Sequence, residues 1–349
     1  MKHAFIILLS LALASLTQSY AATPEAEVEL VASSKAQWTG LAVDQTGTCF
    51  VNYPRWSDSV AFSVGQLIDG KSQPYPNQDW NAWQPGTDPS QHFVCVQALY
   101  IDANQSLWVL DPANPKFGGV VEGGAKLVQI HLQTGTVIRT YHFSQPAIEP
   151  NSYLNDVRID LKHQVAYITD SGKGAIVVLD LETGEARRLL AMHPSTQAED
   201  ISVTVAGIPF EAAVHADGIA YDPKSDTLFY QALTGRTLYK ISAAKLRDAH
   251  LSQTELEAYI DVVGQTGVSD GLLFGPDGKI YISALEQNAI LRTSPSGAVE
   301  TVVQGDQIAW PDSFSLGPDG RLYFTTARIH EGANPTGPYQ IFRLNISNK

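Results

Sequence analysis

Six polar residues occupy equivalent positions in six related segments of the chain. Each stands directly before a short apolar run: Thr39, Gln97, Asn155, Asp217, Asp270 and Asp312. The last four, consecutive among the segments, are Asn or Asp and offer oxygen atoms without His or Cys. Such ligands suit a hard cation, of which Ca²⁺ fits best. Three ionised carboxylates placed together raise one another's pKa values, so they need a cation, protons or local donors.

Three interpretations of these residues stay open. An Asp before Gly often caps a turn by accepting backbone N–H hydrogen bonds, which would make the set structural. Alternatively, Asn155, Asp217, Asp270 and Asp312 hold a metal ion, or all six residues contact an organic ligand. His215, two residues before Asp217, is a candidate general base, although a lone His beside a turn more often only makes hydrogen bonds.

Other polar and aromatic side chains are candidates for the same region. Asp111 and Asp170 end two strands of the repeats and either widen the polar rim or cap loops. A long irregular segment, 66–93, is rich in Pro, Trp, Asn and Asp, and loops of this length in compact domains are often functional. Its aromatic residues and one nearby form an aromatic lid or pack into the core: Trp56, Tyr75, Trp80 and Trp83.

The segments that carry the six polar residues are repeated hairpins. The stretches "VSDGLLFGPDGKIYIS" at 268–283 and "WPDSFSLGPDGRLYFT" at 310–325 share a Pro-Asp-Gly turn between alternating apolar runs. Further copies lie at 38–54, 96–111, 154–170 and 216–231, and most are followed by a second pair of short strands. Four antiparallel strands in each of six units predict an all-β fold, the six-bladed β-propeller.

The chain ends predict how the ring of blades closes. The last unit stops one strand short, at 341–346, whereas residues 27–32 precede the first unit and resemble a fourth strand. We expect this N-terminal strand to complete the last blade and remove the open sheet edges. Two packed sandwiches or an open β-solenoid are the alternatives. In a propeller the innermost strands line the central channel, so the six polar residues form a ring around one of its ends.

Residues 1–21 have the features of a secretory signal peptide. Lys2 and His3 precede an apolar run, and "SYA" at 19–21 predicts cleavage after Ala21. The sequence therefore predicts a secreted or periplasmic protein whose single domain comprises residues 22–349. The apolar run is too short to span a bilayer comfortably, and no other segment is apolar enough.

Composition and charge restrict the partners. The formal net charge of −13 and the lack of a basic cluster argue against nucleic acid and anionic membranes. A neutral or cationic small molecule is easier to accept, and we expect a monomer. Cys49 and Cys95 are the only cysteines. The repeats place them at opposite ends of their blades, farther apart than a disulfide allows, so we expect mostly free thiols.

Five segments resemble the major royal jelly protein/Yellow family, in the same order as in that family. They are "FVNYPRW" at 50–56, "PYPNQDWN" at 74–81, "VAYITDSGKGAIVVLDLETGEARRLL" at 165–190, "LFYQALTGRTLYKI" at 228–241 and "WPDSFSLGPDGRLYFTT" at 310–326. The resemblance, to a bacterial-type member, implies a secreted six-bladed propeller. Insect members include nutrients, cuticle-pigmentation proteins, a melanin-pathway activity and salivary binders of biogenic amines, so it implies no single activity.

A more distant resemblance is to gluconolactonase and senescence-marker propellers, which are metal-dependent lactone hydrolases. Those proteins place a Glu, an Asn and an Asp on a metal at the channel mouth. Asn155 and Asp217 match the Asn and Asp, but Thr39 stands at the position of the Glu. The missing carboxylate argues against the same metal site and activity.

Two classes of function follow. The first is an exported propeller that binds a small molecule, aromatic or amine, at the channel mouth, and we favour it. The second is a metal-assisted hydrolase or isomerase of lactone-like or quinone-like substrates. A protein-interaction scaffold, a common use of propellers, is a weaker third.

Overall fold

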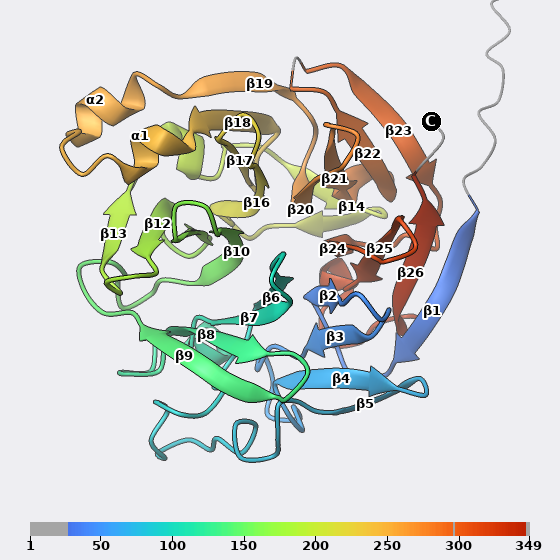
Figure 1. Cartoon of the computed structure of the whole chain (residues 1–349). Helices are drawn as coiled ribbons and strands as arrows, with labels where there is room; N and C mark the ends of the chain where they lie inside the picture. Colours follow the sequence, from blue (N-terminus) through green and yellow to red (C-terminus); the bar gives the residue numbers. More distant parts are fainter. Residues whose placement is uncertain (1–26, 296, 347–349) are drawn as a thin grey trace, which may run out of the picture.

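The structure, a computed structural model, describes residues 27–295 and 297–346. Within them, six four-stranded antiparallel sheets stand around a central channel (Figure 1). The prediction of a six-bladed β-propeller is therefore confirmed. Helices are minor: α1 (Ala243–Arg247) and α2 (Gln253–Glu257) have five residues each. No helix in the described ranges is long and apolar enough to cross a membrane.

The blades follow one another along the chain, each from the channel outward. Blade 1 contains β2 (Leu41–Val43), β3 (Cys49–Asn52), β4 (Val64–Ile68) and β5 (Lys71–Pro74). Blade 2 contains β6 (Ala98–Ile101), β7 (Ser106–Asp111), β8 (Lys126–His131) and β9 (Thr136–His142). Blade 3 contains β10 (Leu154–Asp160), β11 (Val165–Asp170), β12 (Ala175–Asp180) and β13 (Ala186–Leu189).

Blades 4 to 6 repeat this order. Blade 4 contains β16 (Ala216–Asp222), β17 (Thr227–Ala232), β18 (Thr237–Ser242) and β19 (Asp261–Gln265). Blade 5 contains β20 (Ser269–Phe274), β21 (Ile280–Ala284), β22 (Ala289–Thr293) and β23 (Val299–Gln304). Blade 6 contains β24 (Pro311–Leu316), β25 (Arg321–Thr326), β26 (Tyr339–Asn345) and, as its outermost strand, β1 (Val28–Ser34).

The N-terminal strand closes the ring as the chain ends predict. Strand β1 pairs antiparallel with β26, with Val28 opposite Leu344 and Ala32 opposite Ile341. The first and last parts of the chain thus lie side by side in one sheet (Figure 1). Glu29 of β1 also forms ion pairs with Arg321 and Arg343 of blade 6.

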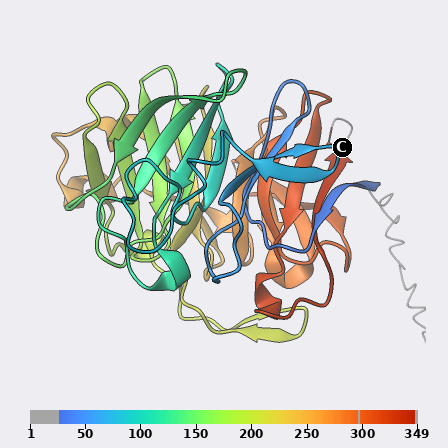
Figure 2. The ribbon, with the colours of Figure 1, turned by 90° about the horizontal axis from the view of Figure 1, so that it is seen from below.

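The innermost strands all begin at one end of the channel, which we call the ring end. They finish at the other, the turn end, where hairpin turns lead into the second strands. At the ring end, a segment between blades 3 and 4 carries an extra hairpin, β14 (Val203–Val205) and β15 (Ile208–Phe210). This hairpin stands out from one face of the disc (Figure 2).

The core consists of apolar clusters between neighbouring blades. The long segment after β5 contributes to them: Tyr75 stacks edge-on against Phe50, Trp80 packs against Phe93, and Trp83 is buried. These three residues therefore follow the core-packing interpretation and not the lid interpretation. Neighbouring blades keep their side chains out of water here, which is the main stabilising effect in such folds.

Both cysteines are buried and free, as expected. Burial raises the pKa of each thiol to about 12, with a smaller contribution from a nearby carboxylate. At neutral pH they therefore remain thiols, which are poor nucleophiles.

Candidate functional site

Three side chains of the predicted ring touch one another in the order of their blades. The Asn155 Nδ2 donates to Asp217 Oδ1 at 2.5 Å, and Asp217 is hydrogen-bonded in turn to Asp270. Asp312 lies near enough to Asp270 for the charge of Asp270 to raise the pKa of Asp312. All four side chains are buried, exposing 8% of their surface or less. The sequence thus identified a real cluster from four different blades.

The ring residues of blades 3 to 6 lie in β-bulges of their strands. In each, the pairing with the second strand shifts across the ring residue: between Leu154 and Val157, Ala216 and Ile219, Ser269 and Leu272, and Pro311 and Phe314. A bulge locally re-aims the side chains that it carries. The first two blades show no such shift in their inner hairpins.

The glycine after two of the aspartates is explained by close backbone approach. A Cβ on Gly218 would lie 2.2 Å from the carbonyl oxygen of Asp270, and one on Gly271 would lie 1.9 Å from that of Asp312. Only glycine lets neighbouring bulges approach this closely. The Asp-Gly pairs therefore reflect contacts between blades.

The carboxylates do not serve as turn caps, so that interpretation of the ring is wrong. Among the described residues, the donors to Asp217, Asp270 and Asp312 are side chains and not backbone N–H groups. Trp310 Nε1 donates to Asp270 Oδ2 at 2.8 Å, and Ser313 Oγ donates to Asp312 Oδ1 at 3.3 Å.

Burial and mutual repulsion keep protons on this cluster. Burial first, and then the charges of Asp270 and Asp312, raise the pKa of Asp217 well above its ordinary value. Burial and Asp270 do the same to the pKa of Asp312. Burial raises the pKa of Asp270 to about 6, although Trp310 and Asp217 donate to it. Asp217 and Asp270 thus share a proton, as close carboxyl pairs do.

The other two ring residues form a neutral half. Thr39 Oγ1 accepts from Asn52 Nδ2 at 2.9 Å and is 3.4 Å from the carbonyl oxygen of Gln97. The side chain of Gln97 accepts a hydrogen bond from the Tyr153 hydroxyl at 2.9 Å. The channel is therefore acidic beside blades 4 to 6 and uncharged beside blades 1 and 2.

His215 lies beside the ring but is not arranged as a base. Its Nδ1 accepts a hydrogen bond from the backbone N–H of Ala198 at 3.0 Å. Burial lowers the pKa of His215, which favours the neutral ring. The neutral ring then carries its proton on Nε2, so that it presents a donor and not an acceptor.

Asp111 and Asp170 are fully buried loop caps. Asp111 accepts from the backbone N–H groups of Val94 and Cys95 and pairs with Lys126 at 3.1 Å. Asp170 accepts from the Tyr153 N–H and pairs with Arg188 at 2.6 Å. Because both carboxylates are satisfied locally, neither widens the rim.

An aromatic group lies at the ring end on the side of blades 1 to 3. Trp56 Nε1 donates to the Tyr153 hydroxyl at 2.7 Å, and Phe117 stacks against both rings, with centroids 5.6 and 5.1 Å away. Phe117 is 63% exposed. It and Lys116 both have positive φ, a strained conformation that is frequent at functional sites. Of the four lid candidates, only Trp56 belongs to this group.

The sequence reading missed Tyr153 and Trp310, although both stand two residues before a ring residue. Each directly precedes an innermost strand, as His215 does before Asp217, so the repeats place all three residues at the ring end. Trp310 packs against Phe210 of the extra hairpin at 5.0 Å and stacks on His330 at 5.7 Å. Phe210, Trp310 and His330 thus cover the acidic side of the ring, next to Asp270.

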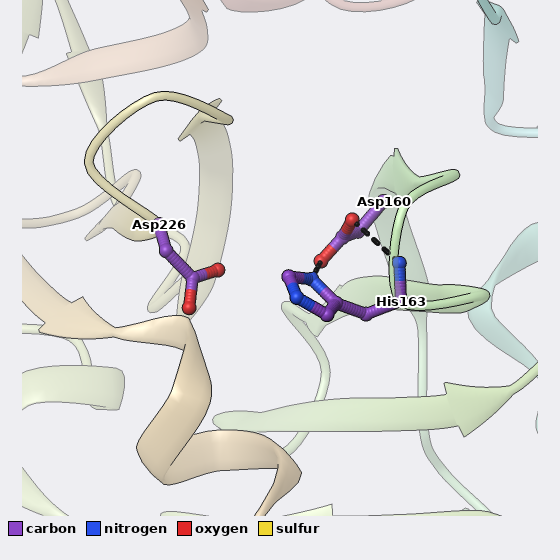
Figure 3. A group of neighbouring side chains, drawn as sticks. All are labelled: Asp160, His163 and Asp226. Atoms are coloured by element: carbon purple, nitrogen blue, oxygen red, sulfur yellow. Dashed lines mark hydrogen bonds and ion pairs between the residues drawn. The ribbon is translucent and has the colours of Figure 1, made fainter.

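A second acidic cluster lies at the turn end, between blades 3 and 4. Asp160, His163 and Asp226 have ligand atoms within 4.8 Å of one another (Figure 3). However, Arg247 donates to Asp160 at 3.2 Å and to Asp226 at 2.6 Å. The guanidinium already supplies the positive charge there, so the cluster is an ion-pair network joining two blades.

Comparisons with known proteins agree on family and fold. The family model of the major royal jelly proteins matches residues 94–326, which is more than half of the chain. The chain therefore belongs to the major royal jelly protein family. No curated protein sequence matches it.

Solved structures with low sequence identity share the propeller. A calcium-binding protein, regucalcin, from Agrobacterium tumefaciens is 18% identical to this chain, with a TM-score of 0.56. The alignment covers 92% of this chain and 93% of the regucalcin chain. A gluconolactonase from Xanthomonas campestris is 12% identical with a TM-score of 0.56, covering 91% and 90%. A virginiamycin B lyase from Staphylococcus aureus is 13% identical with a TM-score of 0.55, covering 92% and 100%. These likenesses concern the fold alone.

Proposed function

We propose that this protein binds a small organic amine at the ring end of its channel. The observation that carries the proposal is the group formed by Asp217, Asp270 and Asp312. These carboxyl groups are buried together, and none of them forms an ion pair with a Lys or Arg in the described chain. Buried carboxylates without counter-charges are costly, and an ammonium group supplies both the charge and hydrogen-bond donors.

The uncharged side of the mouth suits the rest of such a ligand. Trp56, Phe117 and Tyr153 offer aromatic surface there, and Phe117 is largely exposed. Aromatic rings bind flat apolar groups and also attract cations. An amine with an aromatic or apolar body would direct its charge toward blades 4 to 6 and its body toward blades 1 to 3.

A metal-assisted hydrolase or isomerase is the second candidate, because the donor set contains oxygen only. Asn155, Asp217, Asp270 and Asp312 have the chemistry that holds Ca²⁺. When bound, the ion would polarise a carbonyl group of a lactone-like substrate. Two features count against this candidate. The Asn155 amide directs its NH₂ to Asp217 while its oxygen accepts from Ser171 at 3.3 Å, and Thr39 supplies no carboxylate.

Thermal unfolding can separate the two candidates. The purified protein, treated with chelator, is heated with a panel of aliphatic and aromatic amines, with Ca²⁺, and with neither. An amine that binds the folded protein raises the melting temperature by mass action. Asp217→Asn should abolish this increase because Asn keeps the shape but cannot release a proton to become a carboxylate when an ammonium group binds, whereas Asp261→Asn, at an exposed strand position, should keep it.

The outcomes are distinct. Stabilisation by amines that persists in chelator supports amine binding. Stabilisation by Ca²⁺ alone, lost in Asp217→Asn and accompanied by lactone hydrolysis, supports the second candidate. If neither amines nor Ca²⁺ change the melting temperature, the ring does not bind cations and both are wrong.

We further propose that the protein is exported, a proposal that rests on the signal-like residues 1–21, which lie outside the described residues. N-terminal sequencing of protein from the envelope or medium of its host should begin at Ala22. A mature chain that retains Lys2 would contradict export by this route.

A further inference from the structure

The turn end of the channel contains a cavity whose lining includes none of the six ring residues but reaches Asp156, Gly271 and Ser313, which directly follow three of them. Its volume is about 360 Å³, within the range of small-molecule pockets. The inner strands of blades 1, 2, 5 and 6 supply apolar walls, including Leu41, Leu99, Leu272 and Phe314. The hairpin turns of blades 1, 2 and 6 form its rim.

An ion pair from blade 3 forms the polar wall of this cavity. Arg158 Nη1 donates to Asp156 Oδ1 at 2.9 Å. Its Nη2 reaches across the channel to the carbonyl oxygen of Leu272 in blade 5, at 2.6 Å. The guanidinium also lies over the ring of Tyr100, 5.6 Å from its centroid. Arg158 thus spans the channel and is held in place by three blades.

Several polar atoms in this wall have no partner among the described residues. Asp156 Oδ1 accepts two hydrogen bonds, but its Oδ2 accepts none. Arg158 uses its Nη1 and Nη2 groups and leaves Nε–H free. The Tyr100 hydroxyl makes no hydrogen bond either. All three residues line the cavity, which therefore presents an acceptor, a donor and a group that can act as both.

We propose that this cavity binds a neutral polyhydroxylated molecule of monosaccharide size. Hydroxyl groups both donate and accept, so they can satisfy Asp156 Oδ2, Arg158 Nε–H and the Tyr100 hydroxyl together. A neutral ligand fits because Asp156 and Arg158 already compensate each other, and a charged ligand would have to compete with that largely buried ion pair. The C–H face of a sugar ring would pack against the apolar walls.

The rim residues agree with a neutral ligand. Asp44 accepts from the N–H groups of Thr46 and Thr48, and Asp102 accepts from the Trp108 indole at 2.8 Å. These carboxylates hold the hairpin turns and are satisfied within them. Their negative charge nevertheless repels anions, so that sugar acids and phosphates are excluded.

Saturation-transfer NMR on the purified protein tests the proposal. The probes are D-glucose and myo-inositol, with butyrate at the same concentration as a charged control. We expect saturation transfer to at least one neutral probe and little to butyrate. Tyr100→Phe, which keeps the ring and removes the hydroxyl, should weaken binding about fivefold, as the loss of one hydrogen bond does. Arg158→Lys, which keeps the charge and removes Nε–H, should also weaken it.

A matched control distinguishes this site from the ring. Asp217→Asn should leave polyol binding unchanged, because Asp217 does not line the cavity. The absence of transfer to both neutral probes would overturn the proposal. So would transfer that both cavity variants leave unchanged, or a stronger signal from butyrate than from either neutral probe.

Discussion

At the scale of single residues, the protein keeps acidic groups where water cannot solvate them. Asp217, Asp270 and Asp312 are each more than nine-tenths buried, and burial raises the pKa of all three carboxyl groups. The charge of Asp270 raises the pKa values of Asp217 and Asp312 further. Such clusters are frequent at functional sites, because they destabilise the fold and contribute nothing to its packing. A buried acidic cluster is thus a better guide to function here than the channel itself.

The shared proton gives a testable pH dependence. Burial raises the pKa of Asp270 from its ordinary value of 3.8 to about 6 in the folded protein. The folded state therefore binds more protons between these values, and stability is lost as pH rises from about 4 to 6. Relative to Asp270→Asn, the wild type should lose free energy of unfolding over this window. Urea denaturation at several pH values, in chelator, measures the difference.

Asp261→Asn serves as the control for charge alone, since Asp261 is exposed. A wild-type protein whose stability relative to Asp270→Asn stays constant from pH 4 to pH 7 would contradict the assignment of a shared proton to this pair.

The sequence identifies the ring residues but not the residues that shape their surroundings. Equivalent positions in repeats place Asp217 and Asp270 together because every blade has the same geometry. Tyr153 and Trp310 occupy equivalent positions too, two residues before a ring residue, so the same comparison of repeats could have placed them at this site. Arg158 could not be found this way, because its contact with Leu272 crosses the channel between blades that are not neighbours.

At the scale of elements, β-bulges distinguish the inner strands of blades 3 to 6 from those of blades 1 and 2. Four inner strands are shifted at their ring residue, and these four carry Asn or Asp. The unshifted blades 1 and 2 carry Thr39 and Gln97. The alternation of apolar residues in the repeats predicts the strands. It does not predict the bulges, because these depend on contacts with the next blade.

The close approach of neighbouring bulges predicts a large effect for one methyl group. Gly271→Ala would place its Cβ against the carbonyl oxygen of Asp312 and should destabilise the protein by about 1–3 kcal/mol, as overpacking does. Gly305→Ala is the matched control, because nothing lies within 4 Å of a Cβ there. Chemical denaturation measures both, and equal stability of the two variants would show that the bulge tolerates the methyl group.

At the scale of the whole molecule, β1 decides whether blade 6 has its fourth, outermost strand. Strand β26 has partners on both sides only because β1 covers its outer edge. The chain ends and the repeats together were enough to predict this closure. The extra hairpin β14–β15 was not predicted, because its short strands are not part of the repeats. It packs instead on Trp310 through Phe210.

Removing the closing strand should cause association. A chain that begins at Lys35 leaves β26 as an exposed edge, which can pair with other chains. We expect it to elute from size-exclusion chromatography as oligomers or aggregate, whereas a chain that begins at Glu27 should remain a monomer. A monomeric, cooperatively unfolding Lys35 chain would show that β1 is dispensable.

The pairing of Val28 with Leu344 also has a consequence for the order of events during synthesis. Among the described strands, β1 is synthesised first and β26 last, so nearly all of the described chain must be made before the two can pair. Blades 1 to 5 contain only segments made in succession and can form as they emerge. The outermost strand must meanwhile stay unpaired, and its exposed polar and charged residues, such as Glu29, help to keep it soluble while it waits. Ring closure therefore requires β26: a chain truncated before this strand leaves β1 without its partner.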